Sequence, residues 1–183
     1  MPQGILPYKY EQERTASGMT SLGGLPVYLD LACVLGLGES IASHVRVKVQ
    51  GYTDEQMIRS LVLLNLAGGD AVDDLAIIEK DEGFCKVLQR VELKGLARQQ
   101  RRAQERHWKK EKRRTVPSPS AVFRFLSHFH DPFQEGLREK GKAFIPSATA
   151  HLQSLELVNR DLIASIQKKN PSIRLPWTWT PPS

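Results

Sequence analysis

Ten basic side chains lie close together between Lys94 and Arg114, and the chemistry they share is the binding of anions. Glu105 and Glu111 are the acids of this stretch, so it carries +8, while the whole chain carries +6 and everything else sums to −2. Most charge runs are solvated helix faces, but a sign this purely positive leaves little room for i,i+4 salt bridges. The stretch therefore favours binding to a polyanion, and double-stranded DNA matches its length and charge.

The side chains in and after this stretch form two groups of candidate DNA contacts. Lysine and arginine bind phosphates and fix a protein's position on the duplex without reading its sequence. The candidate phosphate contacts are Arg98, Arg101, Arg102, Arg106, Lys109, Lys110, Arg113 and Arg114. Base edges are read in the grooves by arginine and small polar side chains. The candidates for that role are Ser120, Arg124 and Ser127.

Three further features could do chemistry, but each has a simpler structural explanation. The acidic sequence at 70–74 could hold a divalent metal, yet a helix cap followed by first-turn acids explains it better. His128, His130 and Asp131 lack the further ligand that would complete a metal set, and a helix end explains them. Cys85 borders an apolar face and is expected in the core. Because no GxSxG, P-loop or GxGxxG motif occurs, we expect no catalytic residue and no metal site.

The elements that must position the candidate contacts are expected to be helices. Lys94–Arg114 has no proline and consists mostly of good helix formers, so it predicts a basic helix of up to about 30 Å. After a hinge at 116–119, Ser118 as N-cap and Pro119 at the first helical position predict a second helix. Its polar side is free to enter a groove. Its predicted apolar face is Val122, Phe125, Leu126 and Phe129.

Capping residues predict the helices that support these two. Thr20 or Ser21 is expected to cap a helix through LPVYLDLACVL that ends at Gly36 and Gly38. Thr53 with the glutamine three residues later has the spacing of a capping box. The apolar sequence MIRSLVLLNLA that follows predicts the centre of the core. The alternating sequence at 45–49 allows a short strand instead of a loop.

Three more capped helices are predicted, two before the basic stretch and one after it. Asp70 is expected to cap a helix to about Glu79, and Asp81 to cap the next one. The apolar face of that next helix is Phe84, Val87, Leu88 and Val91. Ser147 or Thr149 is expected to cap a last long helix to about Lys169. Its predicted inward residues are Leu152, Leu155, Leu162, Ile163 and Ile166.

These predictions add up to an all-α fold: a multi-helix bundle with a helix-turn-helix-like element, a long basic helix and a disordered tail. The expected regions are an arm (1–19), a helical bundle (20–93), the basic and DNA-reading helices (94–148), a long helix (149–170) and the tail (171–183). Two isolated cysteines indicate a reducing compartment. No signal-peptide core or membrane-length apolar run is present, so we expect a cytoplasmic protein with no membrane partner.

The sequence YTDEQMIRSLVLLNLAGGDAVDDLAIIEKDEGFCKVL resembles the N-terminal region of a large family of bacterial insertion-sequence transposases of the DDE type. The resemblance continues through the basic stretch, VPSPSAVFRFLSHFHD and KAFIPSATAHLQSLELVNRDLIASIQKKNP, and covers about Thr20 to Pro171. It implies a nucleoid-associated protein that recognises the terminal inverted repeats of the element. It also implies a following ribonuclease-H-like domain, in which three carboxylates hold two Mg²⁺ ions for strand cleavage and joining.

The C-terminal sequence departs from the family pattern where the first catalytic aspartate is expected. The family sequence there is similar to TATLDMDAT, whereas this chain reads SIRLPWTWTPPS after Pro171 and has no LDxD. One coding of TATLDMDAT, read one base out of frame, translates as RLPWTWTPP, which is the sequence of Arg174–Pro182. A frameshift that truncates the transposase is our interpretation, and a genuine tail rich in tryptophan and proline is the alternative.

We therefore expect a chain that binds double-stranded DNA at transposon ends but does not cleave or join strands. No cofactor is expected in this chain, and Mg²⁺ is expected only for the full-length family enzyme. In one alternative, the chain pairs with full-length transposase or with a second copy of itself and inhibits transposition. In another, the basic stretch binds the backbone of structured RNA.

Overall fold

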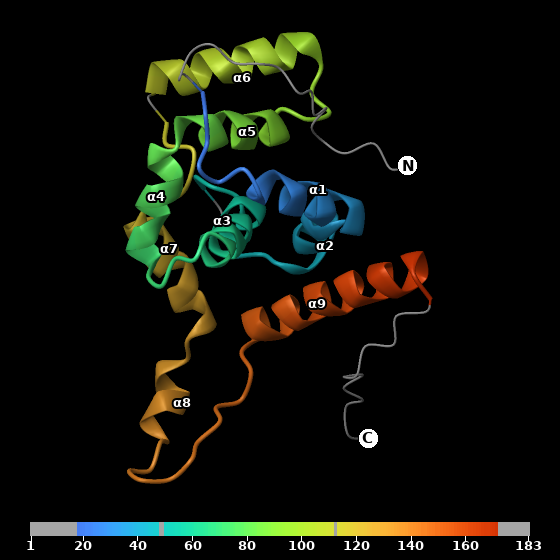
Figure 1. Ribbon diagram of the computed structural model, residues 1–183. Helices are drawn as coiled ribbons and strands as arrows, with labels where there is room; N and C mark the ends of the chain where they lie inside the picture. The colour runs from blue at the N-terminus through green and yellow to red at the C-terminus, as the bar shows by residue number, and fades with distance from the viewer. Residues whose placement is uncertain (1–17, 48–49, 112, 172–183) are drawn as a thin grey trace.

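The computed structural model describes residues 18–47, 50–111 and 113–171, and within them the chain is all-α, as predicted (Figure 1). The α-helices are α1 (Leu25–Leu35), α2 (Leu37–His44), α3 (Asp54–Leu66), α4 (Leu75–Lys80), α5 (Glu82–Glu92), α6 (Arg98–Glu111), α7 (Pro119–Leu126), α8 (Pro132–Gly136) and α9 (Ala150–Lys169). Two 3₁₀ helices are η1 (Val72–Asp74) and η2 (Ser127–Phe129). Residues 45–47 are not in a strand. Parts of three predictions lie outside the described residues: 48–49 of the possible strand, 1–17 of the predicted arm and 172–183 of the predicted tail.

The first two helices form a bent pair. Gly36 between them has φ +77°, a conformation that residues with a Cβ rarely adopt, and the two axes differ by 59°. Gly38 lies inside α2 rather than after the first helix. The predicted caps Thr20 and Ser21 are wrong, because Gly24 holds the N-cap position and both predicted residues bond elsewhere. Among the described residues, no single helix is long and apolar enough to cross a bilayer, and only this bent pair passes that test jointly.

α3 begins with the predicted capping box and contributes one side to the core. The hydroxyl of Thr53 accepts the N–H of Gln56 at 3.2 Å, and the side-chain oxygen of Gln56 accepts the N–H of Thr53 at 3.0 Å. Met57 and Leu63 are buried, as expected for a central helix. The other side of α3 faces solvent, where Val62 is exposed. The apolar sequence of α3 therefore overstates how much of the helix is buried.

The acidic turn before α4 is capped by Asp74. Its carboxylate accepts the N–H groups of Asp70 and Ala71, both at 3.0 Å, and this bonding closes η1. The predicted cap Asp70 is wrong, because Ala71 is the N-cap of η1 and Asp74 is the N-cap of α4. Asp81 is the N-cap of α5, as predicted, and accepts the N–H of Phe84 at 2.8 Å.

The main core lies between α1, α3, α4, α5 and α7. Its buried side chains are Leu25, Leu29, Met57, Leu63, Leu64, Leu75, Ile78, Phe84, Leu88, Val116, Val122 and Phe125. The predicted face of α5 is confirmed, since Phe84 and Leu88 are buried and the two valines pack against the same cluster. The apolar side of α7 and of the η2 turn after it is centred on Phe125 and Phe129, whose ring centroids lie 5.1 Å apart. Leu126 is therefore left 37% exposed, against prediction.

α9 packs along α2 and closes a smaller core of Ile41, Val45 and Val158. Thr149 is its N-cap, one of the two predicted residues, and Asp161 accepts the Ser40 hydroxyl at 2.7 Å across the interface. Leu155 and Leu162 pack against this core, as predicted. Leu152 is 41% exposed, because it lies in the first turn of the helix. Val158, which was not predicted, is the most buried residue of α9.

Candidate nucleic-acid interface

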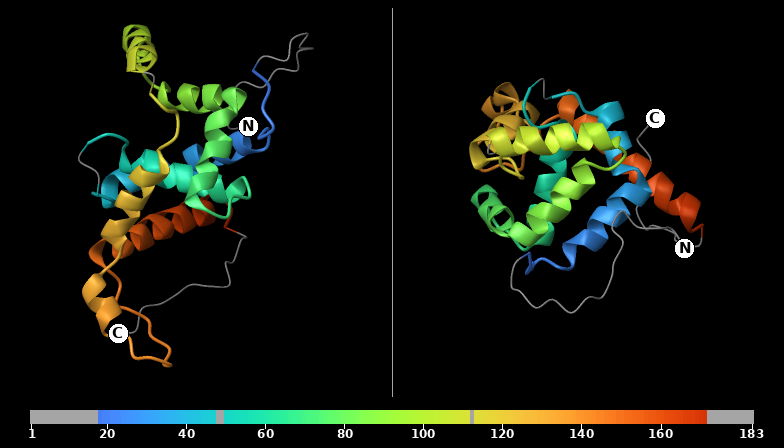
Figure 2. Two further views of the ribbon diagram at one scale, coloured as in Figure 1. Left: turned by 90° about the vertical axis from the view of Figure 1, so that its left-hand side faces the viewer. Right: turned by 90° about the horizontal axis from the view of Figure 1, so that it is seen from above.

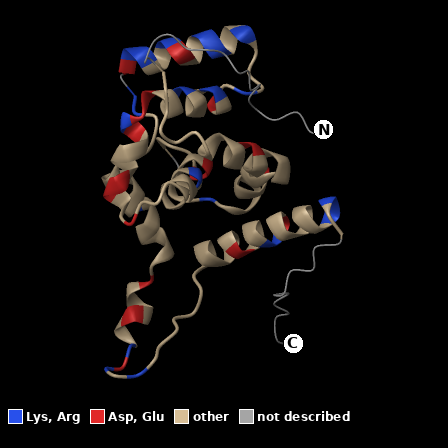
Figure 3. Cartoon of the chain, in the orientation of Figure 1, with Lys and Arg blue, Asp and Glu red and all other residues tan. Residues whose placement is uncertain are grey.

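α6 forms the outermost helix at one end of the molecule (Figure 1). It begins after a tight turn at Gly95, where φ is +78°. Its 14 residues span about 21 Å. This is shorter than a helix made of the whole basic stretch, because the chain leaves the helix before Arg113. None of its residues is buried, and Figure 3 shows the lysine and arginine positions spread along it.

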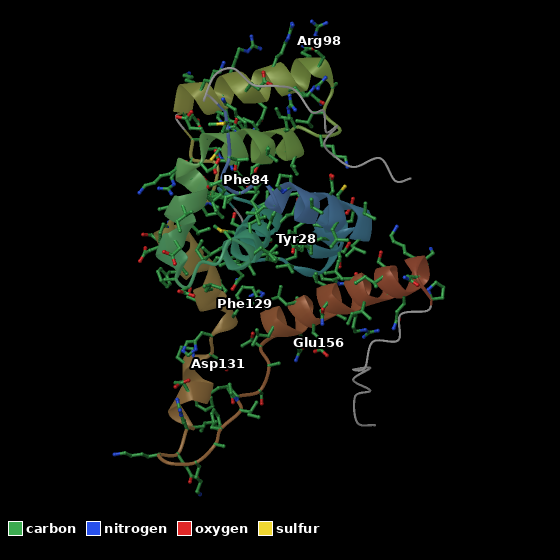
Figure 4. All side chains as sticks on the ribbon, viewed as in Figure 1. Tyr28, Phe84, Arg98, Phe129, Asp131 and Glu156 are labelled. Carbon is green, nitrogen blue, oxygen red and sulfur yellow. The ribbon has the colours of Figure 1, made fainter. Side chains whose placement is uncertain are left out.

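The two sides of α6 differ in what they face. Gln104 and Trp108 are half-buried and line a hollow whose other walls are α3 and α5. Side chains four residues apart lie on the same face of a helix. A row of cations with this spacing occupies the side of α6 opposite Gln104 and Trp108. This row, the outer stripe, consists of Arg98, Arg102, Arg106 and Lys110. Figure 4 shows Arg98 directed away from the body of the protein. Arg101 and Lys109 are exposed as well.

The cations of α6 have no carboxylate partner among the described residues. The ion pairs found there use Arg59, Arg138, Lys142 or a histidine. Of the two acids on α6, Glu111 pairs with His107 at 3.2 Å. Glu105 lies four residues from arginine and lysine on either side but forms no ion pair with them. The positive charge of α6 is therefore available to an external anion.

The segment Arg113–Pro117, which we call the strap, runs from the end of α6 into the core and leads to α7. The carboxylate of Glu79 in α4 accepts the N–H groups of Thr115 at 3.1 Å and of Val116 at 2.9 Å. Tyr52, just before α3, donates its hydroxyl to the carbonyl of Arg114 at 2.8 Å. Burial raises the pKa of Tyr52, although the neighbouring Arg113 opposes that rise, so the hydroxyl keeps its proton to donate. The strap is thus held from two sides.

Arg113 and Arg114, the last two predicted phosphate contacts, are placed differently from the others. The guanidinium of Arg113 lies 4.7 Å from the centroid of the Tyr52 ring, within cation–π range. Its Nη2 also donates to the side-chain oxygen of Gln56 at 3.3 Å. Arg114 is exposed, but its backbone carbonyl accepts a hydrogen bond from the Tyr52 hydroxyl. Arg113 is therefore directed into the body, away from the outer stripe.

A partly buried charge network joins α3 to α5 beneath α6. Glu92 accepts the side-chain N–H of Gln56 at 2.8 Å and the guanidinium of Arg59 at 3.1 Å, and Glu55 accepts from the same arginine at 3.1 Å. Burial raises the pKa of Glu92, and the Arg59 charge opposes that rise. Removing Arg59 would leave the largely buried Glu92 without its cationic partner, which is strongly destabilising. The network thus fixes the platform on which α6 lies.

α7 presents the predicted base-reading side chains on its solvent side. Ser118 caps the helix and Pro119 occupies its first turn, as predicted, so that Val122 and Phe125 point into the core. Ser120, Arg124 and Ser127 are exposed. The Nε of Arg124 donates to the carbonyl of Ser120 at 3.3 Å, and Ser127 donates to the carbonyl of Arg124 at 2.8 Å. Phe123 is 58% exposed beside Arg124, a feature that the apolar periodicity did not reveal.

The two predicted groups of contacts lie in different parts of the molecule. α6 forms the top of the molecule in Figure 1, and α7 lies well below it; the left panel of Figure 2 shows the same separation. The strap is the covalent link between them. The structure brings the α6 cations together on one helix and the α7 side chains on another, but it does not join the two groups into one patch.

The residues considered as metal ligands or nucleophiles do not assemble into a site in the described part of the chain. No group of three or more histidine, cysteine or acidic side chains there could hold a metal ion. His128 and His151 face each other edge to face, with ring centroids 6.3 Å apart. Cys85 is buried, as expected, and donates to the carbonyl of Ile78 at 3.3 Å; burial raises its pKa.

Comparison with known proteins gives no match: no protein-family model, no curated protein and no solved structure matches this chain. The resemblance to insertion-sequence transposases therefore stays a prediction from the sequence. The features available for a functional assignment are the cations of α6, the strap and the exposed side of α7.

Proposed function

We propose that this chain binds double-stranded DNA through the outer stripe of α6. The observation that carries the proposal is the absence of any carboxylate partner for these cations among the described residues, although Glu105 stands within reach on the same helix. A cation already paired inside the protein would have to break that pair before meeting a phosphate. Unpaired cations on an exposed helix instead displace the counterions condensed on DNA, and this release drives binding.

In this proposal α7 supplies sequence recognition in the manner of a helix-turn-helix element. One face of α7 is anchored by Val122 and Phe125, so its opposite side is rigidly presented to a groove. Arg124 has the chemistry to donate two hydrogen bonds to guanine, and the exposed ring of Phe123 can contact a thymine methyl group. The phosphate contacts of α6 would then fix position, while α7 reads bases.

The biological role that we propose is that of the DNA-binding N-terminal region of a DDE insertion-sequence transposase, acting at terminal inverted repeats in the bacterial cytoplasm. The sequence resemblance over about Thr20 to Pro171 supports this role, and the exposed cations of α6 are compatible with it. Strand cleavage and joining are assigned to the domain that holds Mg²⁺ in the full-length family. A strand-nicking assay with Mg²⁺ tests this division, and nicking by the purified chain would overturn it.

The DNA-binding proposal is tested by titrating the full chain into a fluorescently labelled duplex of random sequence and following its anisotropy. Saturable binding at low ionic strength that weakens steeply with added salt is the expected result. A structured RNA of similar length, added as competitor, distinguishes duplex DNA from an A-form partner. Failure to bind the duplex at low salt, or displacement by RNA alone, would overturn the assignment.

One observation favours a second candidate, a regulatory fragment that pairs with full-length transposase or with itself. Val27, Tyr28 and Leu31 of α1 are all exposed, and adjacent exposed apolar side chains often mark a protein interface. The molar mass in solution, measured by light scattering without DNA, tests self-pairing. A monomer that also fails to co-purify with intact transposase would exclude this candidate.

A further inference from the structure

The strap is held by three different elements, although it is only five residues long. Glu79 of α4 binds two of its N–H groups, and Tyr52 before α3 donates to the carbonyls of Arg114 at 2.8 Å and of Val116 at 3.2 Å. From α5, the amide of Gln89 donates to the hydroxyl of Thr115 at 3.4 Å. Because the middle of the strap is buried, its N–H and carbonyl groups need such partners, and these bonds also fix where the strap lies between α4, α5 and the start of α3.

The strap is also fixed at both ends and along its length. At the α6 end, the N–H of Arg113 donates to the carbonyl of Trp108 at 3.2 Å. Val116 is 1% exposed and Pro117 is fully buried, so the middle is packed in the core. At the α7 end, the Ser118 hydroxyl accepts the N–H of Ala121 at 3.3 Å. From Arg113 to Ser118, these bonds and this packing hold the described residues of the connection in one position relative to the start of α7.

We infer that the strap sets a fixed spacing between two separate DNA contacts, one made by α6 and one by α7, and that Tyr52 and Glu79 are positioning residues for this spacing. The inference rests on the proposed function. The protein would then recognise a two-part site on DNA. The phosphates bound by the outer stripe and the bases read by α7 must lie a fixed distance apart on the duplex. Such a linked pair binds more tightly than either part only when the geometry lets both engage at once.

Neither positioning residue is suited to touching DNA itself. The hydroxyl of Tyr52 is directed at strap carbonyls, and its ring is covered by the guanidinium of Arg113. Glu79 carries a negative charge that a phosphate would repel, and its carboxylate is occupied by strap N–H groups. Substituting these residues should therefore act on DNA binding only through the position of the strap.

The test begins with selection of duplexes from a random library by the full-length wild-type chain, followed by mapping of protected phosphates and bases. Half a helical turn, about five base pairs, is then inserted between the two mapped parts, which moves one part to the opposite face of the duplex. Wild-type affinity should fall by at least about tenfold on this insertion. In Tyr52→Phe/Glu79→Gln the same insertion should cost less than about threefold, because the two helices can adjust their separation.

Two further variants separate positioning from loss of stability. Thr53→Ala removes the capping box next to Tyr52 but no strap contact, so it should keep the full wild-type penalty for the insertion. Tyr52→Phe alone keeps the ring under Arg113, so it replaces the double variant if circular dichroism shows that the double variant is unfolded. An intermediate insertion penalty is expected for this single variant.

Three results would overturn the inference, and they differ in what else they affect. If the wild type tolerates the insertion, or if the strap variants keep its full penalty, the fixed spacing is wrong while DNA binding stands. If Thr53→Ala relaxes the penalty as much as the strap variants do, general loosening explains the effect. If the wild type binds no duplex at all, the proposed function fails and this inference fails with it.

Discussion

The outer stripe gives the sharpest prediction, because the proposal assigns its charge to phosphates alone. The variant Arg102→Gln/Arg106→Gln removes two neighbouring cations from the middle of α6. Glutamine has nearly the same helix propensity as arginine and keeps part of its stem. Both side chains are exposed and neither is paired with a described carboxylate, so stability should change by no more than about 0.5 kcal/mol.

The expected magnitude follows from counterion release. Each phosphate contact adds about 0.9 to the slope of the logarithm of the binding constant against that of the salt concentration. Loss of two contacts should therefore lower the slope by about 1.8. If release is the whole contribution, the same loss weakens binding about 60-fold at about 0.1 M salt. These values apply to any duplex sequence, because phosphates carry no sequence information.

The assay is fluorescence anisotropy with a random-sequence duplex at several salt concentrations between about 0.05 and 0.3 M. The matched control is Arg138→Gln/Lys142→Gln, which lowers the net charge by the same amount. These two residues are exposed and pair with Glu135 and Glu139. They follow α8, which lies at the opposite end of the molecule from α6 in Figure 1. The control should leave the slope nearly unchanged.

Two outcomes would refute the assignment of phosphates to the outer stripe. An unchanged slope in the stripe variant would show that these arginines do not meet phosphates. An equal drop in the control would show that the protein responds to net charge rather than to contacts on α6. A lower melting temperature in the stripe variant alone would instead indicate a structural role for Arg102 or Arg106.

Three other predictions follow from single side chains. Arg124→Ala should cost about 1–3 kcal/mol of discrimination between a selected duplex and one mismatched at a single pair, measured by competition, with little change for random DNA. Arg113→Gln should leave the salt slope nearly unchanged but lower the melting temperature, since its guanidinium packs on an aromatic ring. Burial by itself raises the pKa of Asp81, but bonds from the Phe84 N–H and the Thr20 hydroxyl outweigh it and hold the pKa below its ordinary 3.8. The stabilisation by Asp81 is therefore complete above that pH and is lost as the pH falls through the lower folded value. Asp81→Asn should flatten this acid side of a plot of melting temperature against pH.

Much of the fold could be predicted because it depends on interactions between residues that are close in sequence. The capping box at Thr53 and the caps at Asp81, Ser118 and Thr149 join residues three positions apart, so residue type and spacing are sufficient. The apolar face of α5 follows from helical periodicity in the same way. The failed cap at Asp70 shows the limit, because Asp74 accepts the N–H groups of Asp70 and Ala71 and the N-cap of the 3₁₀ turn is Ala71 instead.

The strap could not be predicted, because its partners are distant in sequence. Glu79 lies 36 residues from Thr115, and Tyr52 lies 62 residues from Arg114. Neither partner differs in the sequence from an ordinary exposed glutamate or tyrosine. The sequence predicts only a hinge at 116–119, whereas the structure buries Val116 and Pro117. What the strap is packed against depends on how α3, α4 and α5 come together.

The same limit applies to counting charges for a binding surface. All eight predicted phosphate contacts are basic and lie close together in sequence, so nothing local separates Arg113 from Arg106. Arg106, on the outer stripe, has no carboxylate partner within the described part of the chain, while Arg113 is bound to Tyr52 and Gln56. If only the six exposed cations on α6 meet phosphates, the wild-type salt slope is about 5.4; with all eight it is about 7.2. A measured slope near the lower value would mean that tertiary contacts, rather than charge alone, decide which of these side chains belong to the interface.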